Sequence, residues 1–147
     1  MRRHRESRGQ ALVEFALVLP LFILILVGIF DFGRAIYAYN TIQNAARQAV
    51  RLAIVDQNTT AITDVAVNHA TGLIDATGVT VEFYDVGTDT TYSQCSDAAT
   101  GCELGWTARI TVTYEYQAAT PIIGNLVGTI TMHATSEQGI ESVHQSP

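Results

Sequence analysis

The sequence predicts an α+β protein in which a long N-terminal helix, first apolar and then amphipathic, precedes a small domain. In that domain we expect one further helix to pack on a three- to four-stranded antiparallel sheet. Three observations lead to this fold class: residues 15–30 carry no charge, residues 32–55 repeat apolar side chains at steps of three and four, and from residue 79 onward apolar and polar residues alternate. The first two patterns are typical of helices, and the third is typical of strands with one buried face.

The uncharged run is long enough to cross a membrane. Counted from Ala11 it extends to Phe30, and only Glu14 interrupts it. About 20 helical residues at ~1.5 Å each cover about 30 Å, the hydrocarbon thickness of a bilayer. A carboxylate within such a span costs about 2.5–3.5 kcal/mol, so Glu14 is expected to need a partner. Pro20 removes one hydrogen bond of the same helix, and we expect a kink there.

Charge divides the chain into two unequal parts. Residues 1–51 carry seven Arg against three acidic residues, whereas residues 52–147 carry one Arg against eleven. Four of the Arg precede the apolar run, which places the N-terminus in the cytoplasm and the acidic remainder on the far side of the membrane. A secretory signal peptide begins in a similar way, but no Ala-x-Ala site ends the run, and a plain signal anchor remains an alternative. An acidic domain with a single Arg is not expected to bind nucleic acid.

We expect four segments: a cytoplasmic leader (1–9), a transmembrane helix (10–31), an amphipathic helical stalk (32–55) and an extracytoplasmic α+β domain (56–147). The packing face of the stalk is predicted at Phe32, Ile36, Tyr39, Ile42, Ala46, Ala49, Val50 and Ala53. The alanines make this face narrow enough for another backbone to approach closely. On another face, Arg47 and Arg51 either pair with acidic residues or are solvated.

A second helix is expected over about residues 61–76, after a capping segment at residues 56–60 and before Gly78. Its buried side is predicted at Ile62, Val65, Ala66, His69 and Leu73. On such a face His69 is expected to be a packed, hydrogen-bonded histidine rather than a metal ligand.

Three strands are expected, at residues 79–84, 107–116 and 129–134. The inward-facing positions of the last two are Ala108, Ile110, Val112, Tyr114, Tyr116, Ile130, Met132 and Ala134. The connection between them, residues 118–127, is unusually apolar for a loop in water. It rests on the membrane surface, on a partner, or under the sheet, and the sequence leaves these three open.

Cys95 and Cys102 lie in a polar loop and are expected to form a disulfide on the non-cytoplasmic side of the membrane. A metal site at these two cysteines would lack a second pair of ligands. A calcium site at Asp85, Asp89 and Asp97 is a weaker alternative than solvated turn residues, because their spacing matches no EF-hand pattern.

Four motifs in the first 51 residues resemble the TadE-like proteins, the pseudopilins or minor pilin-like components of the tight-adherence (Flp-type) pilus system. They are RGQALVEFA (8–16), LP (19–20), DFGRA (31–35) and NAARQAVR (44–51). The resemblance implies a pilin-like architecture and a processing site at Gly9, Gln10, Glu14 and Phe15, which a prepilin peptidase cuts after Gly9. It also implies that Glu14 pairs with the N-terminal amine of an adjacent subunit, and that Pro20, Asp31 and Arg34 take part in subunit assembly.

The partners implied by this resemblance are the membrane, the prepilin peptidase, other TadE-like and TadF-like pseudopilins, the pilin and inner-membrane platform proteins. The expected location is the bacterial inner membrane, crossed once, with the C-terminal domain periplasmic or extracellular. No catalytic constellation and no phosphate-binding loop are found in the sequence, so neither enzymatic activity nor a cofactor is expected. The alternatives are an uncleaved single-pass assembly factor and an unrelated membrane-tethered binding domain.

Overall fold

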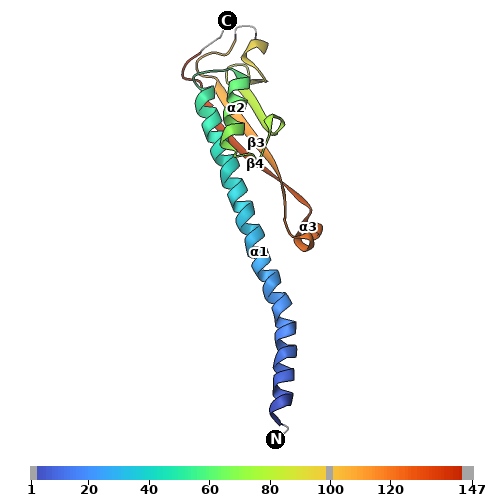
Figure 1. Ribbon diagram of the computed structural model, residues 1–147. Coiled ribbons are helices and arrows are strands. Elements are labelled where there is room, and N and C mark those ends of the chain that lie inside the picture. Colours follow the sequence, from blue (N-terminus) through green and yellow to red (C-terminus); the bar gives the residue numbers. More distant parts are fainter. Residues whose placement is uncertain (1–2, 99–100, 144–147) are drawn as a thin grey trace.

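The computed structural model describes residues 3–98 and 101–143, and its longest element is the helix α1 (Arg3–Ala53). This helix continues through Pro20 without interruption. Its lower half extends away from the rest of the chain, and its upper half packs against the C-terminal domain, which we call the head (Figure 1). The described chain contains one helix long and apolar enough to cross a membrane, and the most apolar part of that helix is not buried by the fold. Such a helix is compatible with a single-pass membrane anchor.

The head contains a four-stranded antiparallel sheet, so the predicted α+β fold class is confirmed. Its strands are β1 (Val79–Asp85), β2 (Thr90–Tyr92), β3 (Thr107–Gln117) and β4 (Thr129–Gly139), in the order β2-β1-β3-β4. The alternation predicted for β3 is present, because Ala108, Ile110 and Val112 are fully buried. The short edge strand β2 was not predicted, since three residues are too few to show an alternating pattern.

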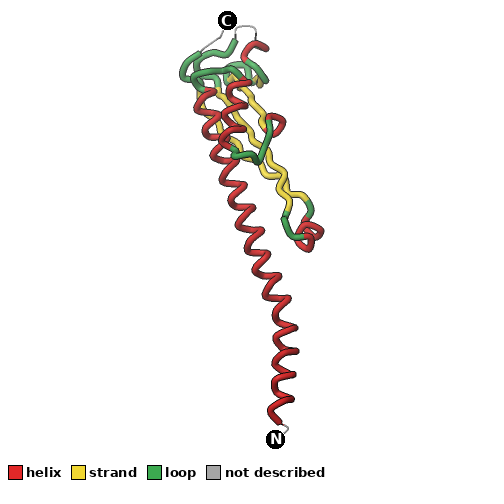
Figure 2. Tube along the Cα trace, in the orientation of Figure 1, coloured by secondary structure: helices red, strands yellow, loops and turns green. Residues whose placement is uncertain are grey.

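The core lies where the upper half of α1 and the helix α2 (Thr59–His69) cover the sheet (Figure 2). Small residues on α1 permit this close packing, because an alanine keeps the two backbones only a methyl group apart. Bulkier side chains from the other elements fill the space between them. The largest fully buried side chains are Phe83, Ile42, Ile62, Ile110 and Val112.

Two predictions about the helices were wrong in detail. The second helix ends at His69, before the left-handed residues Thr71 (φ 51°) and Gly72 (φ 79°), whereas we expected it to reach residue 76. His69 is exposed rather than buried, and the neighbouring Ala70 is buried in its place. The last turn therefore presents a small residue, not an imidazole, to the core.

The packing face of α1 differs from the predicted one just above the apolar run. Phe32, Ile36 and Tyr39 are exposed, and Asp31 and Ala38 are the buried residues of this part of the helix. The prediction followed the bulky side chains, but the head approaches α1 along its smaller residues. From Ile42 upward the predicted and observed faces agree.

The hairpin of β3 and β4 extends beyond the rest of the sheet. The strand β1 pairs with β3 only as far as Val112, while β3 and β4 remain paired down to Gln117 and Thr129. The connection at the tip, which we had expected to be a loop, contains a short helix, α3 (Pro121–Val127). We call residues 113–133 the hairpin arm; it runs beside α1 and places α3 below the head (Figure 1). Ile130, predicted to face inward, is partly exposed because it lies on this arm.

Candidate functional site

The residues of the predicted processing site lie on the free lower end of α1. Gly9, Gln10, Glu14 and Phe15 are all exposed. A Cβ atom placed on Gly9 would meet no other atom within 4 Å. The Glu14 carboxylate accepts a hydrogen bond of 3.3 Å from the Gln10 side-chain amide, one helical turn earlier. Pro20 is also exposed, so no described part of the chain shields this segment from another protein or from lipid.

Asp31 is buried although it follows directly after the apolar run. Only 5% of its surface is exposed. Its carboxylate accepts hydrogen bonds from the backbone N–H groups of Ala119 (3.1 Å) and Thr120 (3.3 Å) and from the Thr120 hydroxyl. Thr120 is the N-cap of α3, so the carboxylate lies at the N-terminus of that helix. The partial positive charge of a helix N-terminus favours an anion at this position.

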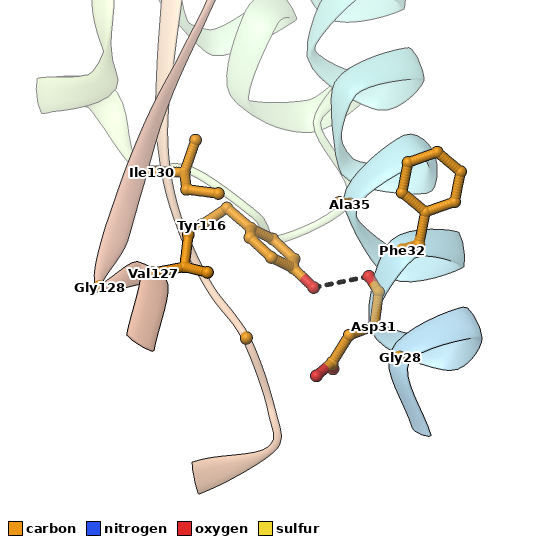
Figure 3. A pocket seen from close by; sticks show the side chains of 9 residues that line it. Gly28, Asp31, Phe32, Ala35, Tyr116, Val127, Gly128 and Ile130 are labelled. Carbon is orange, nitrogen blue, oxygen red and sulfur yellow. Dashed lines mark hydrogen bonds between the residues drawn. The ribbon is translucent and has the colours of Figure 1, made fainter. Parts of the chain in front are cut away.

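Two further side chains complete this joint between α1 and the hairpin arm. The Tyr116 hydroxyl donates a hydrogen bond of 2.7 Å to the backbone carbonyl of Asp31 (Figure 3). Burial, followed by the nearby charge of Asp31, raises the pKa of Tyr116 above its usual value. The Arg34 guanidinium lies 3.8 Å from the Asp31 carboxylate. We call Asp31, Arg34, Tyr116, Ala119 and Thr120 the Asp31 joint.

An apolar cavity of about 240 Å³ lies beside the joint, between α1 and the hairpin arm (Figure 3). The helix contributes Gly28, Asp31, Phe32 and Ala35 to its walls, and the arm contributes Tyr116, Ala118, Val127, Gly128 and Ile130. Apart from Asp31 and the phenol, these side chains offer no polar group. The cavity therefore suits hydrocarbon and not a polar ligand.

The far end of the head is closed by a disulfide. Cys95 and Cys102 are bonded to each other, and Tyr92 stacks on Trp106 beside them with ring centroids 5.3 Å apart. Asp85, Asp89 and Asp97 accept hydrogen bonds from Thr88, Tyr84 and Ser93 respectively. Among the described residues no group of three or more His, Cys, Asp or Glu side chains could hold a metal ion.

Arg47 and Arg51 are exposed on α1. The ion pairs found within the described residues join Arg34 to Asp31 and Arg109 to Glu82 and Glu137. Arg47 and Arg51 are thus not paired with an acidic residue of the described head, and they face outward.

The sequence singled out Asp31 and Arg34, but it did not reveal what Asp31 touches. Tyr116 and Thr120 are far from Asp31 in sequence, and no local pattern links them to it. The available signal was the Thr120-Pro121 pair, because an N-cap residue followed by proline marks the start of a helix. A helix start favours an anion nearby, and the Asp31 carboxylate lies there, bonded to Ala119 and Thr120.

The comparison with known proteins finds a likeness over α1 and none over the head. The profile of the TadE-like protein family matches residues 9–51, which include Glu14, Pro20, Asp31 and Arg34. No curated protein and no solved structure matches the chain. The family likeness therefore concerns the long helix, and the arrangement of the head comes from the structure alone.

Proposed function

We propose that this TadE-like protein is a pilin-like component of a tight-adherence pilus system, anchored in the inner membrane by α1 and joined to other subunits through that helix. The observation that carries the proposal is the exposed lower half of α1, which the fold leaves uncovered over the apolar run. Such a surface requires lipid or neighbouring helices around it. The family match, over residues 9–51, includes this exposed part of the helix. The proposed role is structural and not catalytic.

Glu14 would give this assembly its register. Within its own chain it has a neutral amide as its hydrogen-bond partner, at 3.3 Å, and an amide does not neutralise a carboxylate. A cationic amine brought by an adjacent subunit would neutralise it and offset the cost of placing this charge in lipid, about 2.5–3.5 kcal/mol. We propose that this amine is the new N-terminus formed at Gln10 when a prepilin peptidase cuts after Gly9.

Gly9 suits a peptidase for two physical reasons. Its position is open, with nothing within 4 Å of an added Cβ atom. A glycine also weakens a helix by about 1 kcal/mol relative to alanine, so the backbone around it can extend into a protease more readily. The cut would remove Arg2, Arg3, Arg5 and Arg8 from the chain.

N-terminal sequencing tests this step directly. The protein should be recovered from membranes of cells that hold an active prepilin peptidase and of matched cells that lack it. We expect the chain to begin at Gln10 in the first and at Met1 in the second, and Gly9→Val to remain uncut in both. Recovery of only the uncut chain beside an active peptidase would contradict the cleavage.

The hydrogen bond between Gln10 and Glu14 favours a second candidate, an uncleaved single-pass assembly factor. In such a protein the Gln10 amide would be the permanent partner of the carboxylate. The same sequencing experiment separates the two, because the assembly factor keeps residues 1–9 whether or not the peptidase is active.

A further inference from the structure

We infer that the tip of the hairpin arm, residues 118–130 with α3, is a second membrane contact that rests in the lipid headgroup layer beside the exit of α1 from the bilayer. This inference rests on the proposed membrane anchoring by α1. This second contact would fix the height and tilt of the head above the membrane.

The level of the tip along α1 is set by the Asp31 joint. Ala119 and Thr120 hydrogen bond to Asp31, and Val127 and Gly128 line the cavity together with Gly28. Gly28 lies within the last turn of the uncharged run, about 5 Å below Asp31 at ~1.5 Å per residue. The arm therefore holds α3 beside the last turn of the membrane span (Figures 1 and 3).

The hairpin arm is longer than the sheet requires. The strand β1 covers β3 only up to Val112, and β3 continues to Gln117. Five further residues at about 3.4 Å each extend the ribbon by about 17 Å. A hairpin that served only to complete the head would end where β1 pairing ends, whereas this one reaches the level at which the apolar run of α1 ends.

The composition of the tip matches lipid better than water. Residues 116–132 contain no acidic and no basic side chain, although the rest of the head is strongly acidic. Val127 and Ile130 are 52% and 41% exposed, and Phe32 of α1, which lines the same cavity, is also exposed. Contiguous apolar surface of this kind marks an interaction site.

Charge also decides which partner fits this surface. The acidic head would be repelled by an anionic leaflet, and an uncharged tip is the part that can approach it without that penalty. The backbone N–H groups of Ala119 and Thr120, which precede α3, are satisfied within the joint, because they donate to the Asp31 carboxylate. What remains outward is uncharged: the apolar Val127 and Ile130 lie among the neutral polar side chains of Asn125 and Thr129, and this mixture favours the headgroup boundary.

The experiment uses tryptophan fluorescence of the full chain in phosphatidylcholine vesicles whose acyl chains carry bromine at shallow or deep positions. Val127→Trp and Ile130→Trp place the probe on the tip. Leu24→Trp places it within the span, and Val86→Trp is the matched control, an exposed valine at the far end of the sheet. The native Trp106 precedes β3 at that same far end, about 37 Å from the tip along the strand at about 3.4 Å per residue, and supplies an unquenched background.

We expect the tip variants to lose emission most strongly to shallow bromine and to emit at shorter wavelength, and Leu24→Trp to lose it most strongly to deep bromine. The wild type and Val86→Trp should show no loss. If both tip variants behave like Val86→Trp while Leu24→Trp is quenched, the tip does not contact the membrane, and only the membrane span of α1 is supported. If the tip variants emit at short wavelength without quenching by bromine, and this emission increases with the protein-to-lipid ratio, the tip contacts another protein and not lipid. If Leu24→Trp is not quenched either, both the proposed membrane anchoring by α1 and the proposed membrane contact of the tip are wrong.

Discussion

At the scale of single residues, Asp31 links the membrane helix to the head. Its carboxylate accepts three hydrogen bonds from residues 119 and 120. Asp31→Ala should therefore release the hairpin arm, and amide hydrogen exchange over residues 119–128 should accelerate by on the order of tenfold or more. Exchange in β1 should not change, since that strand does not contact the joint.

Two variants of the same joint serve as controls, measured by hydrogen exchange of the full chain in detergent micelles. Arg34→Gln removes an ion pair of 3.8 Å whose guanidinium is half-exposed, so it should have little effect. Tyr116→Phe removes one hydrogen bond and keeps the ring, so its effect should be intermediate. Unchanged exchange over residues 119–128 in Asp31→Ala would show that packing, not the carboxylate, holds the arm.

Asp75 provides a residue-scale prediction about pH. Its carboxylate accepts hydrogen bonds from the hydroxyl and the backbone N–H of Thr77, and these bonds lower its pKa. A depressed folded-state pKa contributes stability that is present above the ordinary aspartate range and is lost as the pH falls through the folded value. Asp75→Asn should thus be less stable than the wild type at neutral pH, and this difference should disappear in acid. Denaturant unfolding of both proteins at several pH values measures it; a difference that does not vary with pH would contradict it.

Roles that depend on neighbouring residues in the chain could be predicted from the sequence, whereas roles that depend on tertiary contacts could not. The capping segment was correctly located because an Asn or Asp before a helix acts on the next turn of the same chain, and Asn58 is the N-cap of α2. His69 was misplaced because a helical repeat does not reveal where the helix ends. The partners of Asp31 could not be predicted, because Tyr116 and Thr120 reach it only through the length of the hairpin arm.

At the scale of elements, the alanine face of α1 determines how closely the helix approaches α2 and the sheet. Ala49 is fully buried in this face. Ala49→Leu should lower the free energy of unfolding by about 1–3 kcal/mol, because a larger side chain must displace its neighbours. Arg47→Leu on the exposed side of the same helix is the matched control, with an expected change within about 0.5 kcal/mol. Denaturant titration in micelles compares the two, and equal effects would mean that the face is not tightly packed.

Elements with long, regular sequence patterns were predicted well, whereas short elements and packing faces set by tertiary contacts were not. The period of β3 was clear over its whole length, so its buried side was correct. The helix α3 was missed because seven residues contain less than two full helical turns. The lower packing face of α1 was misassigned because the prediction followed the bulky Phe32 and Ile36, which stay exposed, whereas the helix packs through smaller residues such as Ala38.

At the scale of the whole molecule, the head covers only half of α1. The covered half contributes to an ordinary protein core and the uncovered half carries the apolar run, while the match to the TadE-like family extends over both, from residue 9 to residue 51. This division was predictable from the sequence, because charge and hydropathy change along the chain without any need for tertiary information. How the hairpin arm bridges the two halves was not predictable, since only the fold brings residues 116–120 to Asp31.

The uncovered half leads to the last prediction, which concerns Glu14. Glu14→Gln removes the charge and keeps the size and the hydrogen bond with Gln10, so insertion of the helix should become easier by up to about 2.5–3.5 kcal/mol. Docking to a cationic N-terminus should nevertheless be lost, because an amide cannot form the ion pair. We therefore expect normal amounts of the variant in the membrane and a strong loss of piliation and of crosslinking to other pilus subunits. Gln10→Ala, which removes the internal hydrogen-bond donor, should insert and assemble like the wild type. If instead Glu14→Gln assembles normally and Gln10→Ala does not, assembly depends on the hydrogen bond within the chain, and the proposed ion pair between Glu14 and an adjacent subunit is wrong.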